Sequence, residues 1–252
     1  MNPPKWEVLE QLFFWFGDHL PKRRLVQAIQ ILSDARKRRF TRNKEPLYGQ
    51  VFLGFEGQEL SRFMDSLPSK KYRLLFTLQL ILMLRIGEVV RIKVEHFTGG
   101  YGSVYVQLQK GGGPMKKPLP FWISERLRDY VKRNRKRIEK GGGYLFFSED
   151  KYRSTEYPHL SPNYVRKVLR ETAKKADMND VYAISRNGKK LYRINSHSFK
   201  RTGTTLFGEH TGNLALTQSL TGHKSMDVLL KHYWKPSEKS KRDAIERVFG
   251  RS

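Results

Sequence analysis

Apolar residues recur at spacings of three and four through most of the chain, which is typical of amphipathic helices. In the first such stretch, residues 5–20, Trp6, Leu9, Phe13 and Phe16 share one face. The same reasoning predicts further helices at residues 22–39, 58–66, 70–84, 87–93, 124–140, 161–176, 199–209, 213–221, 225–233 and 237–249. Most of the protein is therefore expected to be helical.

One segment has the two-residue period of a strand instead. Residues 101–109 (YGSVYVQLQ) place three apolar side chains on one side, which is typical of a half-buried strand. The run KGGGP at 110–114 turns the chain, and residues 115–119 can return as a second strand. The expected fold class is α+β: mainly α, with a small antiparallel β-hairpin.

The charge of the chain indicates that this helical protein binds a polyanion. The 252 residues include 49 Lys+Arg and 24 Asp+Glu, a formal net charge of +25. Such an excess indicates nucleic acid, the commonest polyanion, with a membrane surface as the rival partner. With 38% hydrophobic residues the chain can build a core. Because cysteine is absent, a disulfide scaffold, a thiolate metal site and a cysteine nucleophile are excluded.

No targeting or membrane segment is expected. The longest apolar stretch, residues 74–84, is too short to span a bilayer. The first twenty residues carry Glu7, Glu10 and Asp18 and have no small-residue cleavage site, unlike a signal peptide. We therefore expect a cytoplasmic protein with no membrane partner.

Two spots in the first half of the chain carry candidate chemistry. Arg85-Ile-Gly-Glu88 follows the apolar helix, so that Glu88 can orient a guanidinium at the core edge; a purely structural ion pair is the alternative. Lys110 stands at the glycine-rich hairpin tip, from which a cation can swing and protonate a leaving group. The alternative is that Lys110 is an exposed lysine that only favours solubility. Lys116 and Lys117 on the return strand compete with Lys110 for the role of proton donor.

Two further spots gather near the C-terminus, and their mixture suits metal-free phosphoryl transfer. A tyrosine oxygen can attack phosphorus, Arg and His can stabilise charge on the non-bridging oxygens, and Lys or His can move protons. No cluster of acids and histidines has ligand spacing, which disfavours a metal nuclease. The residues concerned are His197, Lys200, Arg201, His223 and Tyr233.

In order along the chain, these spots resemble the signature of the tyrosine recombinases of the phage-integrase and Xer type. The resemblance covers about residues 52–250. It implies that Tyr233 attacks a DNA phosphodiester, forms a 3′-phosphotyrosyl link and frees a 5′-hydroxyl, with no metal and no cofactor. The motifs that carry it are Arg85-Ile-Gly-Glu88, Lys110, His197-Ser-Phe-Lys200-Arg201, Leu220-Thr-Gly-His223 and Tyr233.

The resemblance also implies a role for each matched residue. Arg85, supported by Glu88, would clamp the scissile phosphate, and Lys110 would be the general acid to the 5′ oxygen. His197 would assist proton transfer, and His223 would hydrogen-bond the phosphate.

Two positions depart from the family pattern. Lys200 stands where most members have the second arginine, and Arg201 comes one place later. Lysine lacks the bidentate fork of arginine, and on a helix the two side chains point about 100° apart, so only one of them is expected at the phosphate. Tyr233 follows His223 by ten residues, one more than is usual in the family.

The resemblance predicts two domains. Residues 1–48, with nine Lys/Arg between 22 and 44, would be a reduced, basic, helical DNA-binding region ending in a linker at 43–49. Residues 49–252 would be the catalytic domain, whose C-terminal helix, 237–249, packs on a neighbouring subunit.

The resemblance also implies the partners: double-stranded DNA, further copies of the chain from dimer to tetramer, and accessory DNA-bending proteins, in a prokaryotic or viral setting. A catalytically weak DNA-binding relative and a type IB topoisomerase-like strand relaxer are the alternatives.

Overall fold

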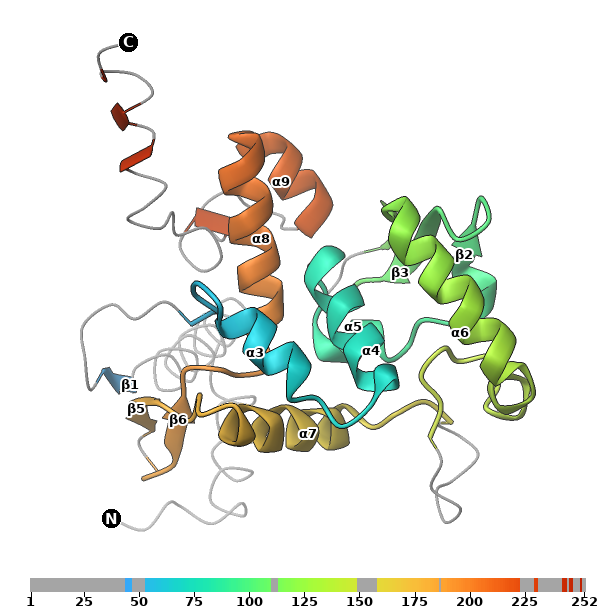
Figure 1. Cartoon of the computed structure of the whole chain (residues 1–252), viewed down its shortest axis with the longest axis horizontal. Coiled ribbons are helices and arrows are strands. Elements are labelled where there is room, and N and C mark those ends of the chain that lie inside the picture. Colours follow the sequence, from blue (N-terminus) through green and yellow to red (C-terminus); the bar gives the residue numbers. More distant parts are fainter. Residues whose placement is uncertain are drawn as a thin grey trace, which may run out of the picture. The chain divides into compact units, whose positions relative to one another are not determined.

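The computed structural model describes residues 44–46, 53–109, 113–148, 158–185 and 187–222, with a few residues beyond 228 (Figure 1). The chain divides into two compact units: Met1–Leu47 with Ala183–Leu191, and Tyr48–Tyr182 with Tyr192–Ser252. The helices expected at 5–20, 22–39, 225–233 and 237–249 lie wholly or mostly outside the described residues.

The first helices of the larger unit are α3 (Glu59–Asp65), α4 (Lys70–Ile81) and α5 (Ile86–Val89). Two expectations are corrected here. The helix expected to reach residue 84 ends at Ile81, because Met83 takes a left-handed φ of 51° and the helical hydrogen-bond ladder stops. The helix expected at 87–93 is the single turn α5. The sharp corner between them places Arg85 at the start of a new helix.

The expected hairpin is confirmed and belongs to a three-stranded antiparallel sheet. The 3₁₀ turn η1 (Val94–His96) leads into β2 (Phe97–Thr98), which pairs with β3 (Ser103–Gln107), which in turn pairs with β4 (Pro114–Pro118). In this register Val104 lies opposite Lys117. Lys117 therefore shares the inward face of the sheet with the buried valines of β3.

The remaining helices match the sequence pattern closely. They are α6 (Phe121–Lys140), α7 (Pro162–Lys175), α8 (Ser198–Thr211) and α9 (Leu214–Thr221). α6 begins at Phe121 rather than at the expected 124, and α7 has Pro162 in its first turn. α8 and α9 both end at glycines in the left-handed conformation, Gly212 and Gly222.

A second small sheet was not expected from the sequence. It consists of β1 (Lys44–Pro46), β5 (Val181–Ser185) and β6 (Lys190–Tyr192), in the order β1-β5-β6. β1 pairs antiparallel with β5, with Lys44 opposite Ser185. Part of the segment expected to be a linker, 43–49, is thus a strand, because backbone pairing with a distant segment outweighs its turn-forming composition.

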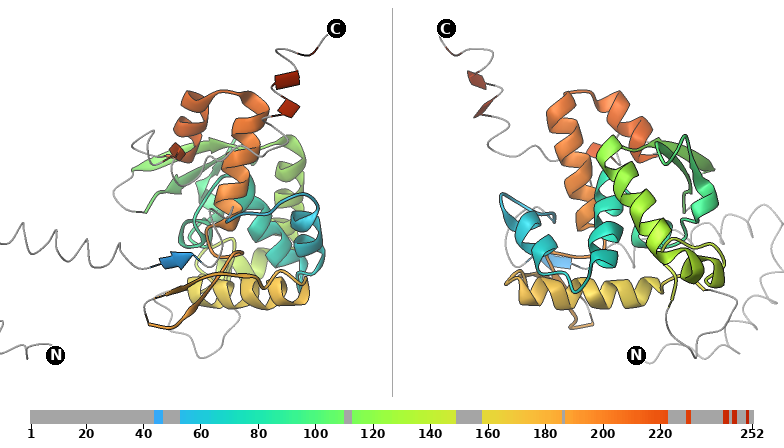
Figure 2. Two further views of the ribbon diagram at one scale, coloured as in Figure 1. Left: turned by 90° about the vertical axis from the view of Figure 1, so that its left-hand side faces the viewer. Right: turned by 45° about the vertical axis from the view of Figure 1, so that its right-hand side comes forward.

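The core of the larger unit draws on α3 to α8 and on β3, and its aromatic cluster lies between α3, α4 and α8, whose ribbons are seen in Figure 2. The rings of Phe76 and Phe199 stack with centroids 4.7 Å apart, and Phe63 packs edge-on against both. Gly203 brings α8 against α4 so closely that a Cβ there would lie 2.1 Å from the carbonyl oxygen of Leu80. The two helices therefore touch backbone to backbone.

The elements as a whole, helices with two small antiparallel sheets, confirm the expected α+β class. Within the described residues, none of the helices has the length and apolar character needed to cross a membrane.

Candidate active site

The corner between α4 and α5 holds the first pair of candidate residues. Arg85 is the N-cap of α5: its backbone N–H donates to Oε2 of Glu88 at 2.7 Å, and its Nη1 donates to Oε1 at 2.9 Å. The Glu88 side chain is fully buried, whereas that of Arg85 is 23% exposed. A buried carboxylate thus fixes a guanidinium whose far side reaches the surface, where it can meet an anion.

The same carboxylate also holds the end of β3. The backbone N–H of Gln109 donates to Oε1 of Glu88 at 3.1 Å. The side-chain amide of Gln109 packs against Gly87, where a Cβ would lie 2.7 Å from Nε2 of Gln109. Lys110, the proposed general acid, is the next residue in the chain and lies outside the described residues.

The start of α8 supplies His197, its half-buried N-cap residue, whose backbone N–H donates to Oδ1 of Asn195 at 3.0 Å. The preceding loop is anchored by Arg193, which forms an ion pair with Glu59 and donates to the carbonyl of Gly54 at 3.0 Å. Although burial alone raises the pKa of Glu59, the hydrogen bond from Arg193 is among the contacts that bring it below its ordinary value. These contacts fix where α8 begins.

Lys200 and Arg201 follow on α8 and are placed differently. Lys200 is 1% exposed, and its Nζ lies 3.4 Å from the carbonyl oxygen of Thr221. Burial lowers the pKa of Lys200 to about 8, with the negative charge of Glu88 opposing and the positive charge of Arg85 adding to the shift. The charge of Lys200 thus interacts with those of Arg85 and Glu88. Arg201 is half-buried.

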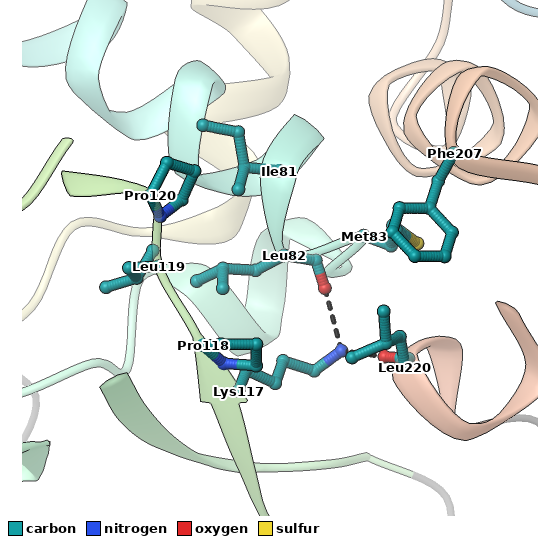
Figure 3. Close-up of a pocket in the computed structure, with 9 residues that line it drawn as sticks. All are labelled: Ile81, Leu82, Met83, Lys117, Pro118, Leu119, Pro120, Phe207 and Leu220. Carbon is teal, nitrogen blue, oxygen red and sulfur yellow. Dashed lines mark hydrogen bonds between the residues drawn. The ribbon is translucent and has the colours of Figure 1, made fainter. Parts of the chain in front are cut away.

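Lys117 belongs to the same cluster. The sequence suggests this lysine only as a competitor of Lys110 for the role of general acid. It is 2% exposed and donates to the carbonyl oxygen of Leu82 at 2.8 Å and to that of Leu220 (Figure 3). Burial lowers its pKa to about 7, helped by the positive charge of Lys200 and opposed by Glu88. The alternation of β4, in which residues 115, 117 and 119 share a face, is the signal that places this lysine inside.

A cavity of about 330 Å³ adjoins Lys117. Figure 3 shows the ammonium at its wall, among side chains from the end of α4, the end of β4, α8 and α9. Apart from the lysine, its lining is mainly apolar, so this space is unlike the charged cluster beside it.

The end of α9 packs directly on the hairpin. Gly222 caps the helix with a φ of 68°, and a Cβ there would lie 2.5 Å from Cδ1 of Leu108 and 3.1 Å from Cε of Met115. Leu108 and Met115 flank the turn that contains Lys110. His223 follows Gly222 in the chain; both His223 and Tyr233 lie outside the described residues.

The described part of the site therefore combines three cations, Arg85, Lys117 and Lys200, with one anion, Glu88. With both lysines protonated, the cluster carries a net charge of 3 − 1 = +2. An uncompensated positive charge in a water-poor environment favours an anionic ligand, and a phosphate group has the matching charge and acceptor oxygens. In the described part of the chain, no three His, Asp or Glu side chains gather closely enough to hold a metal ion.

Comparison with known proteins shows the class to which this chain belongs. Residues 54–240, most of the chain, match the model of the phage integrase family. The chain therefore belongs to the phage integrase family.

Individual relatives fall within the same group. The tyrosine recombinase XerA of Pyrococcus furiosus is 24% identical over 193 residues, which cover 76% of this chain and 60% of that protein. The crystal structure of XerA recombinase superposes with a TM-score of 0.62 at 15% identity, covering 100% of this chain and 87% of that one. The structure of a lambda integrase dimer bound to a COC′ core site superposes with a TM-score of 0.55 at 18% identity, covering 76% of this chain and 62% of that one. At these identities the structural matches show the fold.

Proposed function

We propose that the protein is a site-specific DNA recombinase or integrase that cleaves and rejoins DNA, without a metal or cofactor, through a 3′-phosphotyrosyl intermediate on Tyr233. One observation carries the proposal. Glu88 binds Arg85 and the backbone of Gln109 at once, so that a guanidinium is fixed beside the segment that leads into Lys110. Membership of the phage integrase family supports the same reading.

Arg85 and Lys200 are the proposed phosphate ligands. Arg85 is held by Glu88 and is partly exposed, so its free edge can donate to non-bridging phosphate oxygens. Lys200 is assigned the place of the family's second arginine because its charge interacts with Arg85 and Glu88. This choice favours Lys200 over Arg201, between which the sequence alone does not decide.

The proposed reaction then runs as a transfer between two oxygens. The Tyr233 oxygen forms a bond to phosphorus while the bond from phosphorus to the 5′ oxygen breaks. His197 accepts the tyrosine proton, Lys110 donates a proton to the leaving 5′ oxygen, and His223 donates a hydrogen bond to the phosphate. Attack by the 5′-hydroxyl of a second strand reverses these steps and releases the tyrosine.

Double-stranded DNA and further copies of the chain are the proposed partners. Among the structural neighbours are a lambda integrase dimer on a core site, a lambda integrase tetramer on a Holliday junction and XerH on its difH substrate. We infer assembly from dimer to tetramer through a C-terminal helix at 237–249, with accessory DNA-bending proteins as helpers. We also assign residues 1–48 to DNA binding, residues 49–252 to catalysis, and the protein, of prokaryotic or viral origin, to the cytoplasm.

The test is a covalent-adduct assay. The protein is incubated in EDTA with suicide-nicked and supercoiled DNA, and an adduct stable to SDS but sensitive to protease is sought. Tyr233→Phe abolishes the adduct if the proposal holds, whereas Tyr164→Phe, which alters an exposed tyrosine of α7, retains it. Binding without any adduct favours the DNA-binding accessory protein, and relaxation without recombinant product favours the topoisomerase-like strand relaxer.

A further inference from the structure

Lys117 is buried where an apolar side chain would be expected. Removing an ammonium group from water carries a large penalty unless it is well hydrogen-bonded or paired. Among the described residues, its two hydrogen-bond partners are backbone carbonyl oxygens, those of Leu82 and Leu220, rather than a carboxylate. A methionine would fill the same space without that penalty, so the position of the charge calls for an explanation beyond packing.

The two carbonyl groups belong to segments that lead into the site. Leu82 lies three residues before Arg85, and Leu220 lies three residues before His223. Lys117 itself is on β4, the return strand of the hairpin whose turn contains Lys110. One ammonium group on β4 therefore joins the segments of Leu82 and Leu220 (Figure 3). In the chain, Arg85 and His223 follow these two segments, and Lys110 precedes β4.

A cation is well suited to the end of α9. The last carbonyl groups of a helix lack partners within the helix and carry the negative end of its dipole. Lys117 binds the carbonyl of Leu220, and Lys200 lies 3.4 Å from that of Thr221. Two buried lysines from different elements thus cap the same helix end immediately before Gly222 and His223.

From these contacts we propose that Lys117 is a positioning residue of the strand-cleavage site: its ammonium ties the end of α9 to the α4–α5 corner and thereby sets the place of the segment that continues into His223. The role rests on the proposed function, because it concerns the geometry of that reaction. Lys117 acts through the segments that it joins. The proposal assigns it no contact with the reacting atoms.

The tether is tested first without DNA, by amide hydrogen exchange of Lys117→Met and Lys116→Met. Lys116 is the matched comparison, because it is the neighbouring lysine of β4 and is exposed, with its Nζ 5.9 Å from the ring of Tyr105. We expect amides 219–222 to exchange at least tenfold faster in Lys117→Met than in Lys116→Met. Equal exchange in the two variants overturns the tether, whether or not the protein cleaves DNA.

The effect on the reaction is tested by single-turnover formation of the covalent adduct on suicide-nicked DNA, with binding measured separately by anisotropy. At saturating DNA, Lys117→Met is expected to cleave at least tenfold more slowly than Lys116→Met, with the two dissociation constants within about threefold. If amides 219–222 exchange faster in Lys117→Met but the two variants cleave DNA at equal rates, the tether exists and the positioning role is overturned. Absence of any adduct from the wild-type protein overturns the proposed function and the positioning role with it, while the exchange result still decides whether the tether exists.

Discussion

The backbone N–H of Gln109 donates to the buried carboxylate of Glu88 at 3.1 Å, and the same carboxylate accepts from both the side chain and the backbone of Arg85. Three donors from two elements thus share one anion. Because the carboxylate is fully buried, its charge is screened very little by water, and the geometry of the α5–β3 junction depends on it.

Replacement of this anion should therefore damage both stability and activity. Glu88→Gln is expected to lower the free energy of unfolding by about 3 kcal/mol, since it leaves buried cations without their counter-charge, and to slow cleavage by about 100-fold. Urea denaturation and adduct formation measure the two effects. Glu95→Gln is the control, because Glu95 forms an exposed ion pair with Lys93 and should change stability by less than about 0.5 kcal/mol. Equal effects of the two substitutions would contradict the assignment.

The choice between Lys200 and Arg201 leads to a second prediction. Lys200→Met should reduce the single-turnover cleavage rate by about 100-fold, because it removes a cation from the Arg85–Glu88 cluster. Arg201→Met should reduce it by less than about tenfold. The reverse order would transfer the phosphate contact to Arg201 and show that the family's second cation has shifted by one place.

The helix-end glycines offer an internal comparison. Gly222 and Gly212 cap α9 and α8 with φ values of 68° and 63°. Alanine at either position should meet a similar backbone penalty of about 1 kcal/mol. Gly222→Ala should lose about 1–3 kcal/mol more, because its Cβ would overlap Leu108, whereas a Cβ at Gly212 meets nothing within 4 Å. Chemical denaturation of both variants measures the difference, and equal losses would show that α9 does not press on the hairpin.

The lowered pKa of Lys117 predicts a pH dependence of stability. Below about pH 7 the lysine is charged in both the folded and unfolded protein, and the folded state bears the full burial penalty. Between about 7 and the ordinary value of 10.5, the unfolded state binds more protons, so the contribution of Lys117 to stability rises with pH.

Lys117→Met removes this contribution. The variant should therefore be more stable than the wild type near pH 7, and its advantage should shrink by up to about 1.4 kcal/mol per pH unit between pH 7.5 and 9. The charges of Lys200 and Glu88 also act on the ammonium of Lys117 and so influence how steeply stability changes with pH. Both residues are therefore left unchanged when the variant is compared with the wild type. An advantage that stays constant across this range would show that Lys117 titrates normally.

Where a local pattern decides the structure, the sequence was a good guide. The alternation in 101–109 and the periodicity of 161–176 and 213–221 predicted β3, α7 and α9 closely, because in each the buried face is visible in the chain itself. α4 shows the limit of this reasoning. It is apolar on most sides, so nothing in the periodicity indicates that the helix stops at Ile81.

Other features depend on partners distant in the chain. The strand Lys44–Pro46 is polar and contains a proline, and it exists through its pairing with Ala183–Ser185. The alternation of β4 places Lys117 on the inward face, but the groups that it binds, the carbonyl groups of Leu82 and Leu220, come from distant segments of the chain. The roles of the motif residues stay predictions from the sequence, whereas the contacts of the buried lysine that joins their segments are visible only in the tertiary structure.

The backbone contact at Gly203 provides a criterion for comparing homologues. This glycine sets the separation between α8, which bears Lys200, and α4, which leads to Arg85, because any side chain at 203 would collide with the carbonyl of Leu80. A homologue with alanine or serine at the aligned position must therefore hold these two helices farther apart, which would also change the separation between Lys200 on α8 and the α4–α5 corner that bears Arg85.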